Sequence, residues 1–322
     1  MNNFYTSILA DAIQGFVRER EALGYHRKKE ATSLRRFDRF CVETGHNDLC
    51  LSKGLAMRWA EKKPYESDDA QGRRIRLVRM LARYMARSGY DAYIYPDYLG
   101  VSRSDTYQPY LFSEAELARF FTCVDRCMPH RNSPYRHLIF TLLYRMLYGC
   151  GLRVSEALHL NVDDVDSEEG TLTIKNAKFH KDRMVPMSAS LTKRCRNYME
   201  AMHLAGRPEH PFFPSPYGGR YPERTIYAYF RRFIWEAGIS HGGRGKGPRV
   251  HDLRHTFAVH CLKRWVRSGA DLTAALPYLS VYLGHTGLKG TQHYLRLTAE
   301  LYPDIAEAMD EQFGHLLPGG DQ

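Results

Sequence analysis

The chain has 322 residues, of which 43% are hydrophobic and 25% charged, so it is long enough for two folded domains and too apolar for a disordered protein. No stretch approaches the roughly 20 consecutive apolar residues of a membrane span, and residues 1–21 lack the basic start and cleavage site of a secretory leader. A formal net charge of +10 favours a polyanionic partner, while the seven scattered cysteines are typical of reduced thiols in a bacterial cytoplasm.

Residues 1 to about 90 show the apolar periodicity of four helices. The first ends before Gly24, the second stops at Gly45, a shorter one spans about 51–62, and the fourth is rich in arginine. Because no strand pattern interrupts them, the sequence predicts an all-helical domain over residues 1–92.

The fourth helix carries arginines around an apolar stripe. The stripe is formed by Ile75, Val78, Leu81, Ala82 and Met85. A solvated helix face usually mixes charges of both signs, whereas this segment has no acidic residue after Asp69. We therefore expect a helix that contacts phosphate groups, with a merely solvated face as the alternative. The arginines expected to bind DNA are Arg73, Arg74, Arg76, Arg79 and Arg83.

A tyrosine-rich segment without a sustained period follows this helical domain. It contains Pro96 and Gly100, which favour a linker over residues 93–106. Ser113 and Glu116 then form an S-x-x-E capping box that opens a helix. A second domain is predicted over residues 107–322.

The second domain is predicted to be mainly α, with a small antiparallel β-sheet. In TLTIKNAKFHKDRMVPM, apolar residues alternate with polar ones, turn through a basic loop and return, which predicts a hairpin or the edge of a small sheet. Two basic loops are expected to contact DNA. Their cations are Lys175 and Lys181 in this hairpin, and Arg244 and Lys246 in the loop GGRGKG.

The segment HDLRHTFAVH places His251, Arg254 and His255 on one face of a helix. Two histidines four residues apart can share a zinc ion, but here Asp252 stands where a metalloprotease has glutamate. Arg254 would moreover place a cation beside the metal. No metal site is therefore predicted. An arginine suits a phosphate better, because the planar guanidinium group matches two phosphate oxygens.

Three further segments supply what cleavage of a phosphodiester requires: cations, a nucleophile and an acid. GCGLRVSEALHL contains Arg153 with Glu156 three residues later, the hairpin supplies lysines, and YLGHTGLKGTQHYL contains His285 and Tyr294. Taken alone, the arginine could be a surface ion pair and the tyrosine a core aromatic.

The joint order of these motifs resembles the tyrosine recombinase (phage integrase) family. GLRVSE, a lysine hairpin before VP, HDLRHTFA, LGH and a tyrosine nine residues after that histidine follow one another as in the family. The resemblance covers residues 110 to 300, and the helical N-terminal part is similar to the family's SAM-like core-binding domain. It implies a two-domain enzyme that clamps duplex DNA.

The resemblance implies a role for each site residue. Arg153 and Arg254 would clamp the scissile phosphate, and Glu156 would support the first arginine. His251 would assist proton transfer, and His285 would donate a further hydrogen bond.

The nucleophile and the general acid follow from the same resemblance. Tyr294 would attack the phosphorus, in a surrounding of positive charge that lowers the pKa of its phenol. Lys178 would protonate the leaving oxygen, with Lys181 as the alternative and Lys175 as a third choice. His255 is expected to support the site by bonding the backbone or neighbouring helices rather than by acting directly in catalysis.

The implied function is site-specific DNA recombination through a 3′-phosphotyrosyl intermediate, without a metal, ATP or another cofactor. Strand exchange would need four protomers on two DNA sites, with accessory DNA-bending factors as further partners. An apolar stripe in residues 301–313 would dock on a neighbouring protomer or complete its own core.

The biological role stays open at this point. A mobile genetic element, with integration or transposition, is favoured, and the alternatives are a chromosome-dimer or plasmid resolvase and a type IB topoisomerase relative. A DNA-binding accessory protein with an inactive recombinase fold is the competing function.

Overall fold

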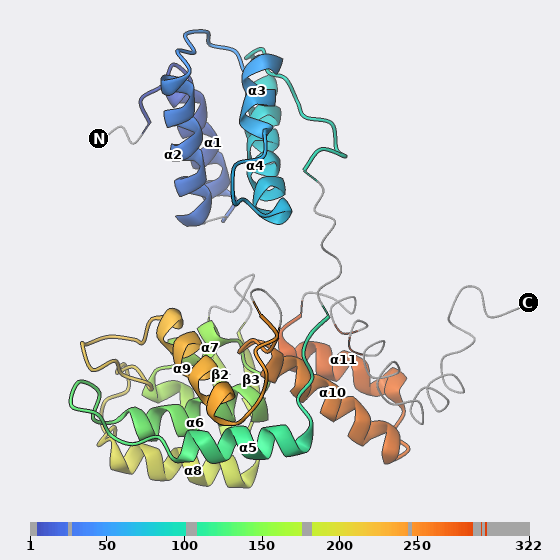
Figure 1. The fold of residues 1–322 in the computed structure, drawn as a ribbon. Helices are drawn as coiled ribbons and strands as arrows, with labels where there is room; N and C mark the ends of the chain where they lie inside the picture. Colours follow the sequence, from blue (N-terminus) through green and yellow to red (C-terminus); the bar gives the residue numbers. More distant parts are fainter. Residues whose placement is uncertain are drawn as a thin grey trace, which may run out of the picture. The chain divides into compact units, whose positions relative to one another are not determined.

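Residues 5–24, 28–100, 108–175, 182–243, 247–285, 291 and 294 are described in the computed structural model of the chain. Their contacts divide the chain into two units, Met1–Gln108 and Pro109–Gln322, whose elements Figure 1 labels. Each unit has a hydrophobic core of its own. The described parts are mainly helical with one small antiparallel sheet, which confirms the predicted fold class. In these ranges, no helix combines the length and the apolar character needed to cross a membrane.

The N-terminal unit contains the four predicted helices. They are α1 (Ala10–Ala22), α2 (Lys28–Glu43), α3 (Lys53–Ala60) and α4 (Asp68–Arg87). The hydroxyls of Ser52 and Ser67 accept hydrogen bonds from the first turns of α3 and α4 and so fix where these helices begin. Helix α4 contacts each of the other three helices, and its predicted apolar stripe is buried in their shared core.

The segment expected to be a linker begins inside the folded N-terminal unit. Tyr93 donates its backbone N–H to the Leu51 carbonyl at 2.8 Å, and the Tyr95 side chain is buried with its hydroxyl bonded to the Ala56 carbonyl. The sequence could not reveal this, because a segment held by separated backbone contacts has no periodicity. The linker prediction over residues 93–106 therefore starts too early.

The C-terminal unit contains seven further helices and three strands in its described part. They are α5 (Glu114–Asp125), α6 (Arg136–Gly149), α7 (Val154–His159), β1 (Val165–Asp166), β2 (Thr171–Ile174), β3 (Arg183–Pro186), α8 (Ala189–Ala201), α9 (Glu223–Glu236), α10 (Asp252–Arg267) and α11 (Leu272–Leu283), with a 3-10 turn at Val162–Asp164. The predicted capping box at Ser113 and Glu116 is present at the start of α5.

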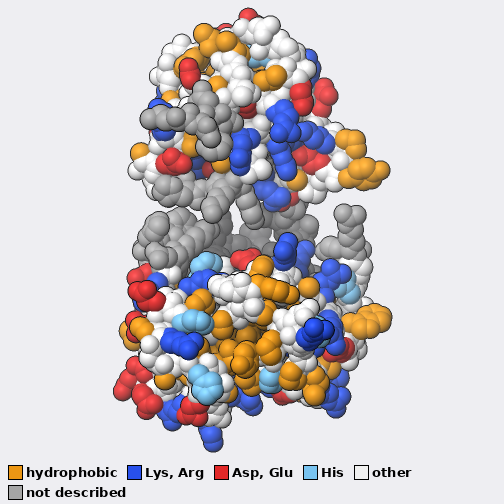
Figure 2. Space-filling view, turned by 90° about the vertical axis from the view of Figure 1, so that its left-hand side faces the viewer, with side chains coloured by type: hydrophobic (Ala, Val, Ile, Leu, Met, Phe, Trp, Pro, Cys, Tyr) orange, Lys and Arg blue, Asp and Glu red, His pale blue; other side chains and the backbone are white. Residues whose placement is uncertain are grey.

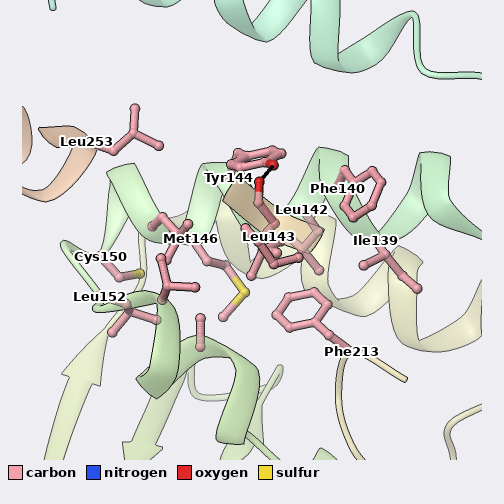
Figure 3. Packing of buried hydrophobic residues seen from close by; sticks show 14 of the residues in the cluster. Ile139, Phe140, Leu142, Leu143, Tyr144, Met146, Cys150, Leu152, Phe213 and Leu253 are labelled. Carbon is pink, nitrogen blue, oxygen red and sulfur yellow. Dashed lines mark hydrogen bonds between the residues drawn. The ribbon is translucent and has the colours of Figure 1, made fainter. Parts of the chain in front are cut away.

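Helix α6 is the packing centre of this unit. It contacts α5, α7, α8 and α10, and its apolar residues are buried on nearly every side. Figure 3 shows Tyr144 among them, with its hydroxyl donating to the Ile226 carbonyl at 2.7 Å. Because α6 ends at Gly149, its C-terminus holds the loop that leads to Arg153 against the start of α10.

The sheet is a three-stranded antiparallel arrangement in the order β1-β2-β3. Strand β2 pairs with β3 so that Leu172 lies opposite Val185 and Ile174 opposite Arg183. Strand β1 adds an edge that the sequence pattern did not reveal. The register places Arg183 at the start of β3, a strand that also contacts α11.

Candidate active site

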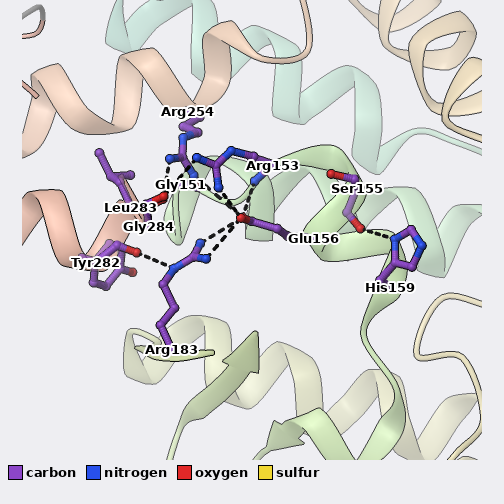
Figure 4. A network of polar contacts seen from close by, with 10 residues as sticks. All are labelled: Gly151, Arg153, Ser155, Glu156, His159, Arg183, Arg254, Tyr282, Leu283 and Gly284. Carbon is purple, nitrogen blue, oxygen red and sulfur yellow. Dashed lines mark hydrogen bonds and ion pairs between the residues drawn. The ribbon is translucent and has the colours of Figure 1, made fainter. Parts of the chain in front are cut away.

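One buried carboxylate organises the centre of the candidate site. Glu156 lies at the start of α7, where one oxygen accepts the backbone N–H of Arg153 at 2.9 Å and the other accepts its guanidinium at 2.5 Å. Arg183 from β3 binds both oxygens, at 3.1 and 2.9 Å (Figure 4). The pairing of Arg153 with Glu156, three residues apart on one helix start, is the pattern predicted from GLRVSE.

The cations keep this carboxylate ionised. Burial alone raises the pKa of Glu156, but the hydrogen bonds and charge of Arg183, followed by those of Arg153, outweigh burial and hold the pKa at about 2. A permanently charged carboxylate can therefore hold the guanidinium groups in place at any physiological pH.

Arg183 is a site residue that sequence reasoning missed. Its side chain is buried, binds Glu156 in bidentate geometry and donates from Nε to the Tyr282 carbonyl at 2.8 Å. The segment KDRMVP could have indicated this role, because a buried arginine at the start of a strand needs a partner of opposite charge. The chain distance of 27 residues to Glu156 hid that partner.

Arg254 is almost completely buried, with 1% of its surface exposed. Its guanidinium donates to the Gly151 carbonyl at 2.8 Å and to the Leu283 carbonyl, and lies 3.8 Å from Glu156. Burial, and then repulsion from Arg153, lowers the pKa of Arg254 to about 10. Arg254 therefore stays a cation at neutral pH, held mainly by backbone dipoles.

Two glycines let the backbone approach these arginines. Gly151 has φ +57°, and a Cβ there would meet the Phe257 ring at 2.6 Å. Gly284 has φ +66°, and a Cβ would meet the Arg183 guanidinium at 2.8 Å. Since their carbonyls accept from Arg254 and Arg153, glycine is required at both positions by conformation and by space.

The two candidate histidines are neutral bases near this cluster. His251 lies at the N-terminus of α10, where burial and then the charges of Arg254 and Arg153 lower its pKa to about 4. The same causes lower the pKa of His285 to about 4, and its Nδ1 lies 3.0 Å from the Thr291 hydroxyl. At neutral pH both rings are uncharged and can each donate one hydrogen bond.

Tyr294 lies against His255 and His285 and is only 3% exposed. Its hydroxyl is 3.0 Å from Nδ1 of His255, and its ring stacks on His285 with centroids 6.0 Å apart. Burial raises the pKa of the phenol, although the charges of Arg254 and Arg153 act in the opposite direction. The expectation of a lowered pKa is therefore wrong for the free protein, because desolvation outweighs the cations.

The structure thus brings together Arg153, Glu156, His251, Arg254, His255, His285 and Tyr294, which the sequence distributes over 142 positions counted from 153 to 294. Among the residues that the structure describes, no group of three His, Cys, Asp or Glu side chains could hold a metal ion.

Comparison with known proteins identifies the family. The model of the phage integrase family matches residues 111–300, a range that includes the whole cluster. The protein assigned as integrase/recombinase y4rB in Sinorhizobium fredii is 31% identical over 314 residues, covering 95% of this chain and 98% of that protein. The chain belongs to the phage integrase family. Its members, the tyrosine recombinases, cleave and rejoin DNA.

Two solved tyrosine recombinase structures share the fold of this phage integrase family member. The Tn1549 transposon integrase in complex with transposon right end DNA has a TM-score of 0.61 at 17% identity, covering 94% of this chain and 99% of that one. The XerH recombinase bound to its difH substrate has a TM-score of 0.57 at 21% identity, covering 96% and 78%. Both confirm the mainly helical architecture with a small sheet.

The arginine-rich helix of this integrase-family chain differs from the expectation at two positions. Arg74 is buried, pairs with Glu66 at 2.7 Å and lies over the Trp59 ring. Arg79 is buried as well, and its guanidinium donates to the Pro96 and Leu99 carbonyls. Both guanidinium groups bind partners inside the N-terminal unit. The prediction that Arg74 and Arg79 contact DNA is therefore replaced by a structural role for both.

The other arginines of α4 face solvent. The side chains of Arg73, Arg76 and Arg83 are 65%, 52% and 51% exposed, and each has an acidic residue nearby. Figure 2 shows Lys and Arg side chains gathered on one face of the N-terminal unit, with acidic side chains at their edges. These exposed arginines stay available for a phosphate backbone.

Of the remaining predicted lysines and arginines, the structure describes only Lys175. Lys175 is exposed at the end of β2 and pairs with the buried Asp164 at 2.6 Å, which raises the pKa of the lysine. Outside the described residues lie the candidates Lys178, Lys181, Arg244 and Lys246. The apolar stripe over residues 301–313 lies outside them too.

Proposed function

We propose that this protein is a site-specific recombinase that cleaves and rejoins duplex DNA through a covalent link to Tyr294. The observation that carries the proposal is the convergence of Tyr294 with two arginines and two neutral histidines that are far apart in the sequence. A buried phenol beside such a cluster is what transfer of a phosphodiester to tyrosine requires.

The charge of the cluster favours a phosphodiester. Three guanidinium groups, of Arg153, Arg183 and Arg254, surround the single carboxylate of Glu156, so three positive charges against one negative charge leave +2. A bound phosphate diester would neutralise part of this excess. Fixed cations around the phosphorus would also stabilise the additional negative charge of the transition state.

The proposed reaction conserves the energy of the phosphodiester. The Tyr294 oxygen attacks phosphorus, a P–O bond forms to the phenol, and the bond from phosphorus to the 5′ oxygen breaks. The 5′ oxygen takes up a proton, for which Lys178 is the proposed donor, and leaves as a hydroxyl. Attack by a 5′-hydroxyl from another strand reverses these steps and rejoins the DNA.

Replacing the nucleophile tests this proposal. We expect Tyr294→Phe to bind a nicked duplex that carries the cleavage site but to form no covalent protein–DNA adduct, measured by denaturing gel electrophoresis. Tyr278→Phe is the matched control, because Tyr278 is an exposed tyrosine on the neighbouring helix α11. An adduct that persists in the Tyr294→Phe variant would place the nucleophile elsewhere.

We propose that the biological role is mobilisation of a genetic element by a tetramer that holds two DNA sites. The similarity to y4rB, assigned as an integrase/recombinase, supports recombination, and the fold shared with the Tn1549 transposon integrase supports a mobile element. Excision would produce a circular DNA whose joined ends can be amplified from cells that express the protein. A resolvase would instead convert plasmid dimers into monomers without producing such a circle.

A further inference from the structure

His255 is the imidazole that contacts the hydroxyl of the proposed nucleophile. It follows Arg254 directly on α10, its Nδ1 lies 3.0 Å from the Tyr294 hydroxyl, and the two ring centroids are 5.5 Å apart. We propose that His255 accepts the phenolic proton of Tyr294 when the phenol attacks DNA. This inference rests on the proposed function, because it assigns a role within that same reaction.

The direction of this hydrogen bond depends on the tautomer of His255. The Arg254 side chain is hydrogen-bonded to Tyr294. A guanidinium group can only donate, so the phenolic oxygen is the acceptor in that bond. The proposal requires the tautomer of His255 with its proton on Nε2, in which Nδ1 accepts the phenolic hydrogen.

The other two imidazoles are placed for different tasks. The rings of His285 and Tyr294 are nearly parallel, with 22° between the planes and centroids 6.0 Å apart, and Nδ1 of His285 bonds Thr291. Nδ1 of His285 is therefore engaged with Thr291 rather than with the phenol. His251 meets His255 edge to face, with centroids 4.7 Å apart, so it borders the proton acceptor.

The step balances without a further reactant. The O–H bond of Tyr294 breaks, its proton forms an N–H bond at Nδ1 of His255, and the electron pair of the oxygen forms the bond to phosphorus. The bond from phosphorus to the 5′ oxygen breaks, and that oxygen takes up a proton from Lys178, the proposed general acid. During rejoining, His255 returns the proton to the departing phenol.

The same helix provides a matched control pair. Nδ1 of His260 lies 2.9 Å from the Tyr148 hydroxyl, so α10 carries a second histidine–tyrosine contact of nearly equal length. Tyr148 belongs to α6, and this pair has no contact with the guanidinium cluster among the interactions that the described residues show. A purely structural histidine–tyrosine bond is therefore available in the same protein.

The first experiment measures covalent adduct formation in a single turnover on a nicked duplex carrying the cleavage site. Asparagine at position 255 retains a polar side chain but cannot take up a proton at neutral pH. We expect His255→Asn to slow adduct formation about 100-fold or more, the usual contribution of a general base, while DNA binding is unchanged. His260→Asn should retain the wild-type rate.

Two chemical changes separate proton transfer from a positioning role. A fluorinated tyrosine at position 294 has a more acidic phenol, so we expect it to restore much of the rate lost in His255→Asn. Sulfur in place of the 5′ bridging oxygen needs no proton to leave, so it should not restore the rate. Should His255→Asn not fold, His255→Gly supplied with free imidazole replaces it, and recovery of the rate is expected.

The outcomes distinguish the two proposals. If the wild-type protein forms no adduct at Tyr294, the proposed function itself fails. If the wild type forms the adduct and His255→Asn does so within about threefold of its rate, His255 is not the proton acceptor. Restoration of the mutant by the sulfur substrate would instead assign His255 to the leaving group and overturn the inference.

Discussion

Arginines are concentrated in two regions of this protein, and they are held in different ways. In the C-terminal unit, Arg153, Arg183 and Arg254 share the carboxylate of Glu156, and each also donates to a backbone carbonyl. In the N-terminal unit, Arg74 has a carboxylate of its own in Glu66. The first arrangement leaves excess positive charge in a buried place, whereas the second neutralises it.

This difference shows that density of arginine does not by itself mark a phosphate site. On α4, Arg74 and Arg79 are buried and donate to carbonyl groups of the N-terminal unit, whereas the Arg76 side chain is 52% exposed. In the guanidinium cluster of the C-terminal unit, the shortage of carboxylates is the feature that would favour a bound anion. Four experiments test this comparison. They neutralise the shared carboxylate, remove the arginine that has its own carboxylate, lower the pH, and remove an exposed arginine.

The largest effect is expected from Glu156→Gln. Neutralising this carboxylate leaves buried guanidinium groups without their counter-charge, so we expect the free energy of unfolding to fall by about 3–5 kcal/mol. Urea unfolding measures this change. Glu168→Gln is the control, because Glu168 forms an exposed pair with Arg196 and should cost less than about 1 kcal/mol. Equal effects of the two variants would contradict the central role of Glu156.

Arg74→Gln should have the next largest effect. It leaves Glu66 without its bidentate partner, and that partner is the main reason why the pKa of Glu66 is lowered. We expect a loss of about 2–4 kcal/mol in the free energy of unfolding of the N-terminal unit. Unfolding of this unit can be followed through Trp59, over which Arg74 lies. Unchanged stability with weakened DNA binding would return Arg74 to the DNA contacts.

Acid should destabilise the C-terminal unit through its two neutral histidines. The folded state lowers the pKa of His251 and His285 from 6.5 to about 4, so the unfolded chain binds more protons between these values. Stability therefore falls as pH decreases from 6.5 towards 4, by about 1–3 kcal/mol for each ring. Urea unfolding at pH 7 and pH 4.5 measures this loss. The double variant His251→Asn, His285→Asn should lose less on acidification than the wild type does.

Arg76→Gln should have the smallest effect on stability, within about 0.5 kcal/mol, because the Arg76 side chain is half exposed. Its expected effect is on DNA binding: the slope of log K against log salt should decrease by about 1 if the side chain contacts one phosphate. Fluorescence anisotropy with duplex DNA at several salt concentrations gives this slope. An unchanged slope would favour the alternative of a merely solvated helix face.

Much of the fold could be predicted from local patterns. Apolar periodicity located the four N-terminal helices, and Ser113 with Glu116 marked the start of α5. The alternation in TLTI and the return in RMVP located β2 and β3. These features depend on residues within a few positions of one another, and so a single sequence contains the information. Strand β1, with two residues, was too short for any pattern.

The sequence by itself indicated most of the chemical groups that the candidate site contains. The order of motifs from Arg153 to Tyr294 indicated the family, and comparison with known proteins confirmed it. The tertiary structure decided how those groups are held: the addition of Arg183, the glycine carbonyls that bind arginines, and the contact of His255 with Tyr294. It also decided that burial raises the pKa of Tyr294. Partners distant in the chain and loss of solvent are properties of packing, and no spacing along the chain encodes them.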